Sequence, residues 1–315
     1  MVGSTSQLKE LVPVYQSVQC KRIWVVVNPA AGQDRPFLQT MNTAFQNAGI
    51  DWDLRITKKA GDGIRLAQEG VKNGADVVAA YGGDGTVGEV AAGLQGTNVP
   101  LAIFPAGTAN VMSSELSIPN ELEAAVALVT GDGVLRSLDM GKVDDRLFLL
   151  RATIGVSADA TDMTEQEDKN RLGRLAYFLS GLKLLPEARS VPYKLVLDGE
   201  KVDVSGTICI VANSGNLGIP GLNLNAKISV SDGLLDVILI EGERLVAFLS
   251  LAANAAGISE PLNHWQVREV TVIADPPQTI EIDGEVIHPT PLTVTVVPQA
   301  VQVIVPAPQT ESENS

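Results

Sequence analysis

The sequence has few of the residues that build disulfide frameworks and transition-metal sites. Its 315 residues include two cysteines, Cys20 and Cys209, and two histidines, His264 and His288. These numbers are too small for a disulfide framework, for a zinc site with four Cys or Cys/His ligands, or for a catalytic zinc site with three histidines. We therefore expect oxygen ligands around any metal that the protein requires.

Basic residues are also scarce. Lys and Arg number 23 against 37 Asp and Glu, which gives a formal net charge of −14. This sign of charge opposes binding to a phosphate backbone, so we expect no nucleic-acid partner.

Long apolar runs are missing as well. The longest charge-free apolar stretch, residues 245–259, has 15 residues and contains Asn254, whereas crossing a bilayer takes about 20. The apolar stretch Ile23–Val27 behind Arg22 is too short for the core of a signal peptide. We expect a cytoplasmic protein without a membrane span.

The length favours two domains, and the sequence pattern changes near Asp139. From residue 21 to 139, short apolar runs alternate with segments of helical period, which predicts a parallel α/β domain. The predicted strands there are 23–27, 77–81 and 99–104, and the predicted helices are 37–48, 62–73 and a third between Asn120 and Gly131. Gly49 and Gly74 are expected to end the first two helices.

Residues 140–299 are rich in β-forming segments bounded by Gly, Pro, Asn and Asp, which predicts a mostly antiparallel second domain. The predicted strands are 147–152, 193–197, 207–212, 234–240, 267–273 and 292–297, with helices at 172–185 and 245–257. The last run, 301–305, fits either domain, so residues 300–306 are candidates to complete the first. Residues 1–20 and 309–315 are polar and weakly patterned, and we expect mobile ends there.

The strongest local motif follows the predicted strand 77–81. Gly82-Gly83-Asp84-Gly85-Thr86 leads into Val87-Gly88-Glu89-Val90, the pattern of a strand, a glycine turn and a helix start. Glycines let backbone N–H groups approach an anion at the positive end of a helix. Thr86 and Glu89 have the spacing of a capping box for that helix.

Three interpretations of this motif compete. The Gly-x-Gly-x-x-Gly pattern of dinucleotide folds is present, but no Asp or Glu occurs between Val90 and Ser114, where that fold needs one, and no Walker loop is present. An ordinary tight turn, with Asp84 accepting local N–H groups, remains open. The third interpretation is a phosphate site. A carboxylate beside phosphates is repelled unless a cation lies between them, so this interpretation predicts magnesium at Asp84.

Two other predicted strands end in small polar loops. Asn28-Pro29-Ala30-Ala31-Gly32 follows the first, and Pro105-Ala106-Gly107-Thr108-Ala109-Asn110 follows strand 99–104. Loops after parallel strands emerge at the same edge of a sheet, where α/β folds bind ligands. We therefore expect the three loops to form one site.

In order and spacing, these motifs and the late Asp283-Gly284-Glu285 resemble the diacylglycerol kinase catalytic family, and most closely its bacterial lipid kinases, relatives of sphingosine and ceramide kinases with an NAD kinase-like fold. The resemblance covers about residues 21–305. It implies an α/β nucleotide domain followed by a β-sandwich domain, with ATP and a lipid such as diacylglycerol meeting between them.

The resemblance also implies roles for single residues. The nucleotide site would be lined by Asn28, Thr57, Gly83, Gly85, Thr86, Gly107 and Thr108. Asp84 would act through magnesium, and Asp283 and Glu285 would be the catalytic carboxylates. Phosphoryl transfer to an alcohol needs a base near the attacking hydroxyl, and both histidines lie outside the motifs, so we expect Glu285 to be the base with Asp283 supporting it. The alternative for Asp283-Gly284 is a plain hairpin turn.

Two positions depart from the family pattern. Ser231-Asp232-Gly233 stands where the family has Asp-Asp-Gly at a structural magnesium site, so Asp232 keeps its position while one carboxylate is lost. After Asn110 the chain has Val111 and no Arg before Glu115, where many members have Asp and then Arg. This change predicts altered contacts on the side of the acceptor.

Residues 168–189 are the best candidate for membrane contact. Leu172, Leu175, Leu179 and Leu182 form a helical stripe, and the segment carries five basic and two acidic residues. A basic amphipathic helix can lie on anionic lipid headgroups, which would make the protein peripheral at the inner membrane face. Packing in the core is the alternative for this helix.

Two further functions stay open at this point. An NAD kinase shares Gly-Gly-Asp-Gly-Thr but pairs it with an Asn-Glu segment downstream, where this chain has residues 105–110. A nucleotide- or lipid-binding regulator without turnover is the other. The sequence leaves the acceptor lipid and the oligomeric state open, a homo-oligomer included.

Overall fold

The computed structural model describes residues 18–31, 36–155, 190–219, 222–224, 228–241 and 263–308. The helices predicted at 172–185 and 245–257, the basic segment 168–189, Gly32 and the tail 309–315 lie outside the described residues. Val18 and Cys20 pack against the core of the first domain. Residues 1–17 lie outside the described residues, and the mobile end predicted for residues 1–20 stays a prediction.

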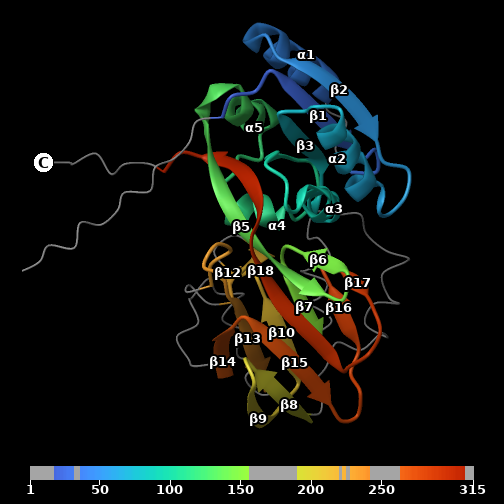
Figure 1. Cartoon of the computed structure of the whole chain (residues 1–315), viewed down its shortest axis with the longest axis vertical. Coiled ribbons are helices and arrows are strands. Elements are labelled where there is room, and N and C mark those ends of the chain that lie inside the picture. Colours follow the sequence, from blue (N-terminus) through green and yellow to red (C-terminus); the bar gives the residue numbers. More distant parts are fainter. Residues whose placement is uncertain are drawn as a thin grey trace, which may run out of the picture.

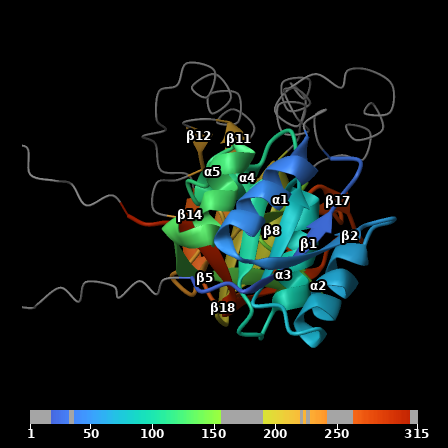
Figure 2. The same ribbon diagram turned by 90° about the horizontal axis from the view of Figure 1, so that it is seen from above.

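The first domain is a parallel sheet between two layers of helices. Its strands are β1 (Arg22–Val27), β2 (Asp51–Ile56), β3 (Val77–Gly82) and β4 (Leu101–Pro105), in the order β2-β1-β3-β4. The helices are α1 (Phe37–Ala48), α2 (Asp62–Lys72), α3 (Asp84–Leu94), α4 (Val111–Glu115) and α5 (Leu122–Ala127), followed by the π-helical turn η1 (Leu128–Asp132). Helices α1 and α5 cover one face of the sheet, and α2 and α3 cover the other (Figure 2).

Strand order places the ligand crevice of such a sheet. The chain passes from β1 to β2 on one side and then returns to β3 on the other side of β1. Parallel α/β sheets bind ligands where the strand order reverses, beyond the carboxyl ends of the strands. Here that point lies between the ends of β1 and β3, where the loops beginning at Asn28 and Gly83 emerge.

Local sequence explains the ends of the helices. The C-cap of α1 is Gly49, whose φ of 68° is the left-handed conformation expected of a glycine at this position.

Strand β2 was not predicted, although Asp51-Trp52-Asp53-Leu54-Arg55-Ile56 alternates polar and apolar residues as an edge strand does. Trp52 and Leu54 pack against the core.

The second domain is a sandwich of two antiparallel sheets, as predicted. One sheet has the order β14-β13-β10-β7-β16-β17. Its strands are β14 (Asn263–Val267), β13 (Leu235–Ile240), β10 (Ile208–Ala212), β7 (Arg151–Ile154), β16 (Ile280–Ile282) and β17 (Glu285–Val286). The opposite sheet contains β15 (Glu269–Ala274), β8 (Val191–Leu197) and β9 (Glu200–Gly206). A separate hairpin pairs β11 (Asn216–Ile219) with β12 (Leu222–Asn223).

Two long strands run through both domains. Strand β18 (Leu292–Pro306) pairs with β15 near its start and lies parallel to β4 at Val303, so one sheet of ten strands crosses the molecule (Figure 1). Strand β5 (Gly133–Val143) pairs with β18 along most of its length and with β6 (Arg146–Phe148). The domain limits at residues 139 and 300 therefore stay a prediction, because each falls inside a continuous strand.

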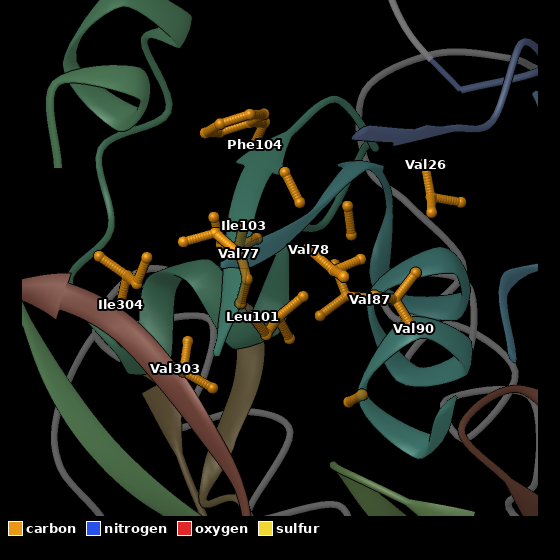
Figure 3. Close-up of a cluster of buried hydrophobic side chains, with 14 of the residues drawn as sticks. Val26, Val77, Val78, Val87, Val90, Leu101, Ile103, Phe104, Val303 and Ile304 are labelled. Atoms are coloured by element: carbon orange, nitrogen blue, oxygen red, sulfur yellow. The ribbon is translucent and has the colours of Figure 1, made fainter. Parts of the chain in front are cut away.

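Each domain has its own hydrophobic core. In the first, Val87 and Val90 of α3 face the buried β3 and β4 side chains, and Val303 and Ile304 of β18 join the same cluster (Figure 3). The second core lies between the two sheets of the sandwich and includes Val211, Val237 and Val272.

Candidate active site

One cavity of about 460 Å³ brings together loops of both domains. From the first domain it is lined by the loops after β1, β3 and β4, and from the second by the start of β7 and the β16–β17 hairpin. The predicted residues Asn28, Gly83, Asp84, Gly85, Thr86, Gly107, Thr108, Asp283 and Glu285 all line it. Sequence reasoning named neither Arg151 nor Glu281, which also line the cavity.

The two glycine loops of the first domain pack backbone against backbone. A Cβ atom placed on Gly107 would lie 2.5 Å from the Cα atom of Gly83 and 2.9 Å from Asn110 Oδ1. The amide side chain of Asn110 accepts a hydrogen bond from Gly107 N (2.9 Å) and donates one to Gly107 O (3.1 Å). The fold therefore requires glycine at residue 107.

Gly85 differs from these glycines. It lies in the first turn of α3, and a Cβ atom built there would have no heavy atom within 4 Å. The fold does not need glycine here, and a Cβ atom would instead occupy part of the cavity beside the helix N-terminus. Helix N-termini bind anions through their unpaired N–H groups.

Asp84 is the first residue of α3, and its N-cap is Gly83. Its Oδ1 accepts a hydrogen bond from Met112 N at the start of α4 (3.1 Å). Burial raises the pKa of the Asp84 carboxyl above its ordinary value, while the N–H groups of Met112 and Val111 and the charge of Arg151 act in the opposite direction.

The capping box predicted for Thr86 and Glu89 is wrong, because the helix begins two residues before Thr86. Glu89 instead reaches α2, where its two carboxylate oxygens accept hydrogen bonds from Gly61 N (2.8 Å) and Gly63 N (2.7 Å). The carboxylate thus satisfies the N-terminus of the neighbouring helix, where negative charge is favoured.

Asn28 joins the loop after β1 to the glycine loop, residues 82–86. Its Nδ2 donates to Thr86 Oγ1 (3.2 Å), and its Oδ1 accepts from Ala30 N (3.0 Å). Thr57 follows β2 and donates two hydrogen bonds to the carbonyl oxygen of Val27, one from its N–H (2.9 Å) and one from its Oγ1 (3.4 Å). It is not among the residues that line the cavity, and its contact with a nucleotide stays a prediction.

The Asp283-Gly284 pair forms the hairpin turn between β16 and β17. Both residues have positive φ angles, 46° and 91°, the pattern of a type I′ turn. The Asp283 carboxylate accepts backbone hydrogen bonds from Leu149 N (3.0 Å), Leu150 N (3.2 Å) and Arg151 N (2.9 Å). Burial raises the pKa of this carboxyl to about 6, while the N–H groups and the Arg151 charge act to lower it. Asp283 therefore holds the start of β7 against the hairpin.

Glu285 lies on the rim of the cavity. Its side chain is 56% exposed and forms an ion pair with Arg146 of β6. With its oxygens bonded to the backbone, Asp283 supports the hairpin that presents Glu285 to the cavity. The roles expected for Glu285 and Asp283 stay predictions.

Asp232 lies outside the cavity. Its Oδ1 accepts a hydrogen bond from Leu234 N (3.0 Å) and closes a tight turn. Asp139 holds the same loop, because its Oδ2 accepts from Gly233 N (2.6 Å) and its Oδ1 from Gln299 N (2.7 Å). In the described ranges no group of three or more His, Cys, Asp or Glu side chains could hold a metal ion. The metal role of Asp232 stays a prediction.

Comparison with known proteins extends these observations. Residues 22–143 match the model of the diacylglycerol kinase catalytic domain, and residues 151–305 match the model of the YegS C-terminal NAD kinase β-sandwich-like domain. The chain is 30% identical over 277 residues to the diacylglycerol kinase of Bacillus subtilis, covering 84% of this chain and 90% of that protein. The chain belongs to the diacylglycerol kinase and YegS lipid kinase family.

Other family members agree in extent and fold. A diacylglycerol kinase of Mycobacterium tuberculosis is 30% identical to this chain, and the match covers 83% of this chain and 87% of that protein. A diacylglycerol kinase structure from Bacillus anthracis superposes with a TM-score of 0.77 over 91% of this chain and 98% of its own, at 24% identity, and so shares the fold. Kinases of the family use ATP. In the described part of the chain, no helix is long and apolar enough to cross a membrane.

Proposed function

We propose that this protein is an ATP- and magnesium-dependent lipid kinase that phosphorylates the hydroxyl of diacylglycerol or a similar lipid. One observation carries the proposal: the glycine loop with Asp84 in the first domain and the hairpin with Glu285 in the second line the same cavity. An anion-binding helix terminus and a carboxylate base are the two parts that phosphoryl transfer to an alcohol needs.

The proposed reaction is a direct transfer. The lipid hydroxyl oxygen forms a bond to the γ-phosphorus of ATP, the bond from that phosphorus to the bridging oxygen breaks, and ADP leaves. The hydroxyl proton passes to the Glu285 carboxylate, which lies on the cavity rim. Asp283 keeps Glu285 in place through the three backbone N–H groups that it binds.

The residues present fit magnesium that arrives with the nucleotide. Magnesium usually keeps several waters and takes one or two carboxylates plus substrate phosphates, so a dedicated cage of protein ligands is not required. Asp84 would hold it beside the first turn of α3, where the ion would neutralise phosphate charge next to the carboxylate.

Labelled ATP, magnesium and a panel of diacylglycerol, sphingosine, ceramide and NAD test the proposal. We expect phosphate on diacylglycerol or a related lipid, and a loss of at least about a hundredfold in the variants Asp84→Asn and Glu285→Gln. Glu200→Gln removes an exposed carboxylate of β9 and serves as the control.

The alternatives give different outcomes. Phosphate on NAD alone overturns the proposal in favour of an NAD kinase. ATP binding without transfer to any lipid favours a regulator. Normal turnover by Asp84→Asn removes that residue from the mechanism.

A further inference from the structure

Charge in the cavity is unbalanced. Of the described residues that line it, four carry carboxylates, Asp84, Glu281, Asp283 and Glu285, and Arg151 is the only Lys, Arg or His. A polyphosphate entering this cavity meets like charges, which repel strongly at short range in a partly desolvated site. Arg151 is therefore the side chain on these walls with a charge that attracts phosphate.

The position of Arg151 is fixed by two hydrogen bonds to other residues of the second domain. Its Nη1 donates to Asn216 O (2.9 Å), and its backbone N–H donates to Asp283 Oδ1 (2.9 Å). Asn216 is held in turn by α4, because Asn216 N donates to Glu115 Oε2 (3.1 Å) and Asn216 Nδ2 donates to Ser114 Oγ (3.1 Å).

Helix α4 also holds the glycine loop, residues 82–86. The N–H of Met112, at the other end of α4, donates to Asp84 Oδ1, and the Arg151 charge interacts with Asp84. Hydrogen bonds and charges thus link Asp84, α4, Asn216 and Arg151 around the cavity. This ring holds the guanidinium in a defined place before a ligand arrives, which is what electrostatic catalysis requires.

Burial is costly for this cation. Desolvation lowers the pKa of Arg151, and Asp283, Glu281 and Asp84 act against the change. A guanidinium keeps its charge even so, and its planar set of donors matches phosphate oxygens in pairs.

We infer that Arg151 is a catalytic residue that contacts the γ-phosphoryl group during transfer, an inference that rests on the proposed kinase function. As the lipid oxygen bonds to the γ-phosphorus and the bond to ADP breaks, the guanidinium donates hydrogen bonds to the oxygens of the phosphoryl group. Phosphoryl transfer depends mainly on such charge stabilisation and positioning.

Two substitutions of Arg151 test this role in the full-length protein. Arg151→Gln removes the charge, and Arg151→Lys keeps the charge but loses the paired donors. We expect kcat to fall about a hundredfold or more in Arg151→Gln and less in Arg151→Lys. Arg268→Gln, which removes an exposed arginine between β14 and β15, is the matched control and should keep wild-type kcat.

Nucleotide binding without lipid gives the second readout. Contact with the γ-phosphoryl group predicts that Arg151→Gln weakens ATP binding about tenfold or more while ADP binding stays within about twofold of wild type. Equal weakening of ATP and ADP, or unchanged ATP binding, overturns the inference and leaves Arg151 as a structural counter-ion. Thermal unfolding of each variant identifies a loss of fold, and Arg151→Lys then supplies the ATP-to-ADP comparison.

The two proposals fail in different ways. If the wild-type protein phosphorylates no lipid, the kinase proposal fails, whereas the ATP-to-ADP comparison still measures contact with the γ-phosphate. If the wild type phosphorylates lipid and Arg151→Gln retains its kcat, only the inference about Arg151 fails.

Discussion

Replacing Gly85 and Gly107 by alanine, one at a time, separates a glycine that the ligand requires from a glycine that the fold requires. At Gly107 the added methyl group would lie 2.5 Å from Gly83 Cα, so the two loops must separate or the bonds to Asn110 must break. Overpacking costs about 1–3 kcal/mol and a lost hydrogen bond about 1 kcal/mol. We expect Gly107→Ala to lower the free energy of unfolding by about 2–4 kcal/mol.

At Gly85 the expected change in the free energy of unfolding has the opposite sign. The position is helical and open, so alanine should raise the free energy of unfolding by at most about 1 kcal/mol. ATP binding should weaken about tenfold to a hundredfold, because the methyl group keeps a phosphate from one charge-assisted hydrogen bond.

Thermal unfolding and titration with ATP measure the two effects separately. Gly88→Ala is the control: it lies one turn later in α3, its Cβ would be 3.9 Å from Asp283 Oδ2, and it does not line the cavity. It should bind ATP like wild type. If Gly85→Ala also binds ATP like wild type, no phosphate lies against the first turn of α3, and the reasoning about this helix terminus is refuted.

Two further predictions concern carboxylates that accept hydrogen bonds from backbone N–H groups. Burial raises the pKa of Asp283 from 3.8 to about 6, so the folded protein binds this proton more tightly than the unfolded chain. The resulting stabilisation is present below about pH 4 and is lost, by about 3 kcal/mol, as the pH rises through 6. Urea unfolding of Asp283→Asn should show a flatter pH profile than wild type, and an equal slope would contradict this. Asp139→Asn leaves the N–H of either Gly233 or Gln299 without its acceptor, so we expect a loss of about 2 kcal/mol and faster amide exchange there; wild-type exchange would count against it.

Local sequence signals predicted much of the first domain. Apolar runs and helical period identified β1, β3, α1 and α2 because the side chains that form these elements also form the core. Strand β2 was not predicted because it lies at the edge of the sheet, where only alternate residues need to be apolar.

Long-range contacts were harder to predict. Glu89 has the spacing of a capping box, but the start of α3 at Asp84 places it beside the N–H groups of α2 instead. Spacing along one helix carries no information about a neighbouring helix, so this contact had no signal in the sequence.

The sequence identified those site residues that lie in contiguous motifs. Arg151 follows the apolar residues Leu147–Leu150, and a charge within such a run is a signal that could have identified it. Its partners could not be identified in the same way, because Asn216 and Asp283 lie 65 and 132 residues further along the chain.

Strand β18 completes the sheet of the first domain from a distant part of the sequence. The outer edge of β4 is paired by β18 at Val303, and Val301 and Ile304 belong to the core of the first domain. During synthesis the ribosome makes residues 22–143 long before this strand exists. The sheet of the first domain therefore has an unpaired edge at β4 until residues 292–306 have been made.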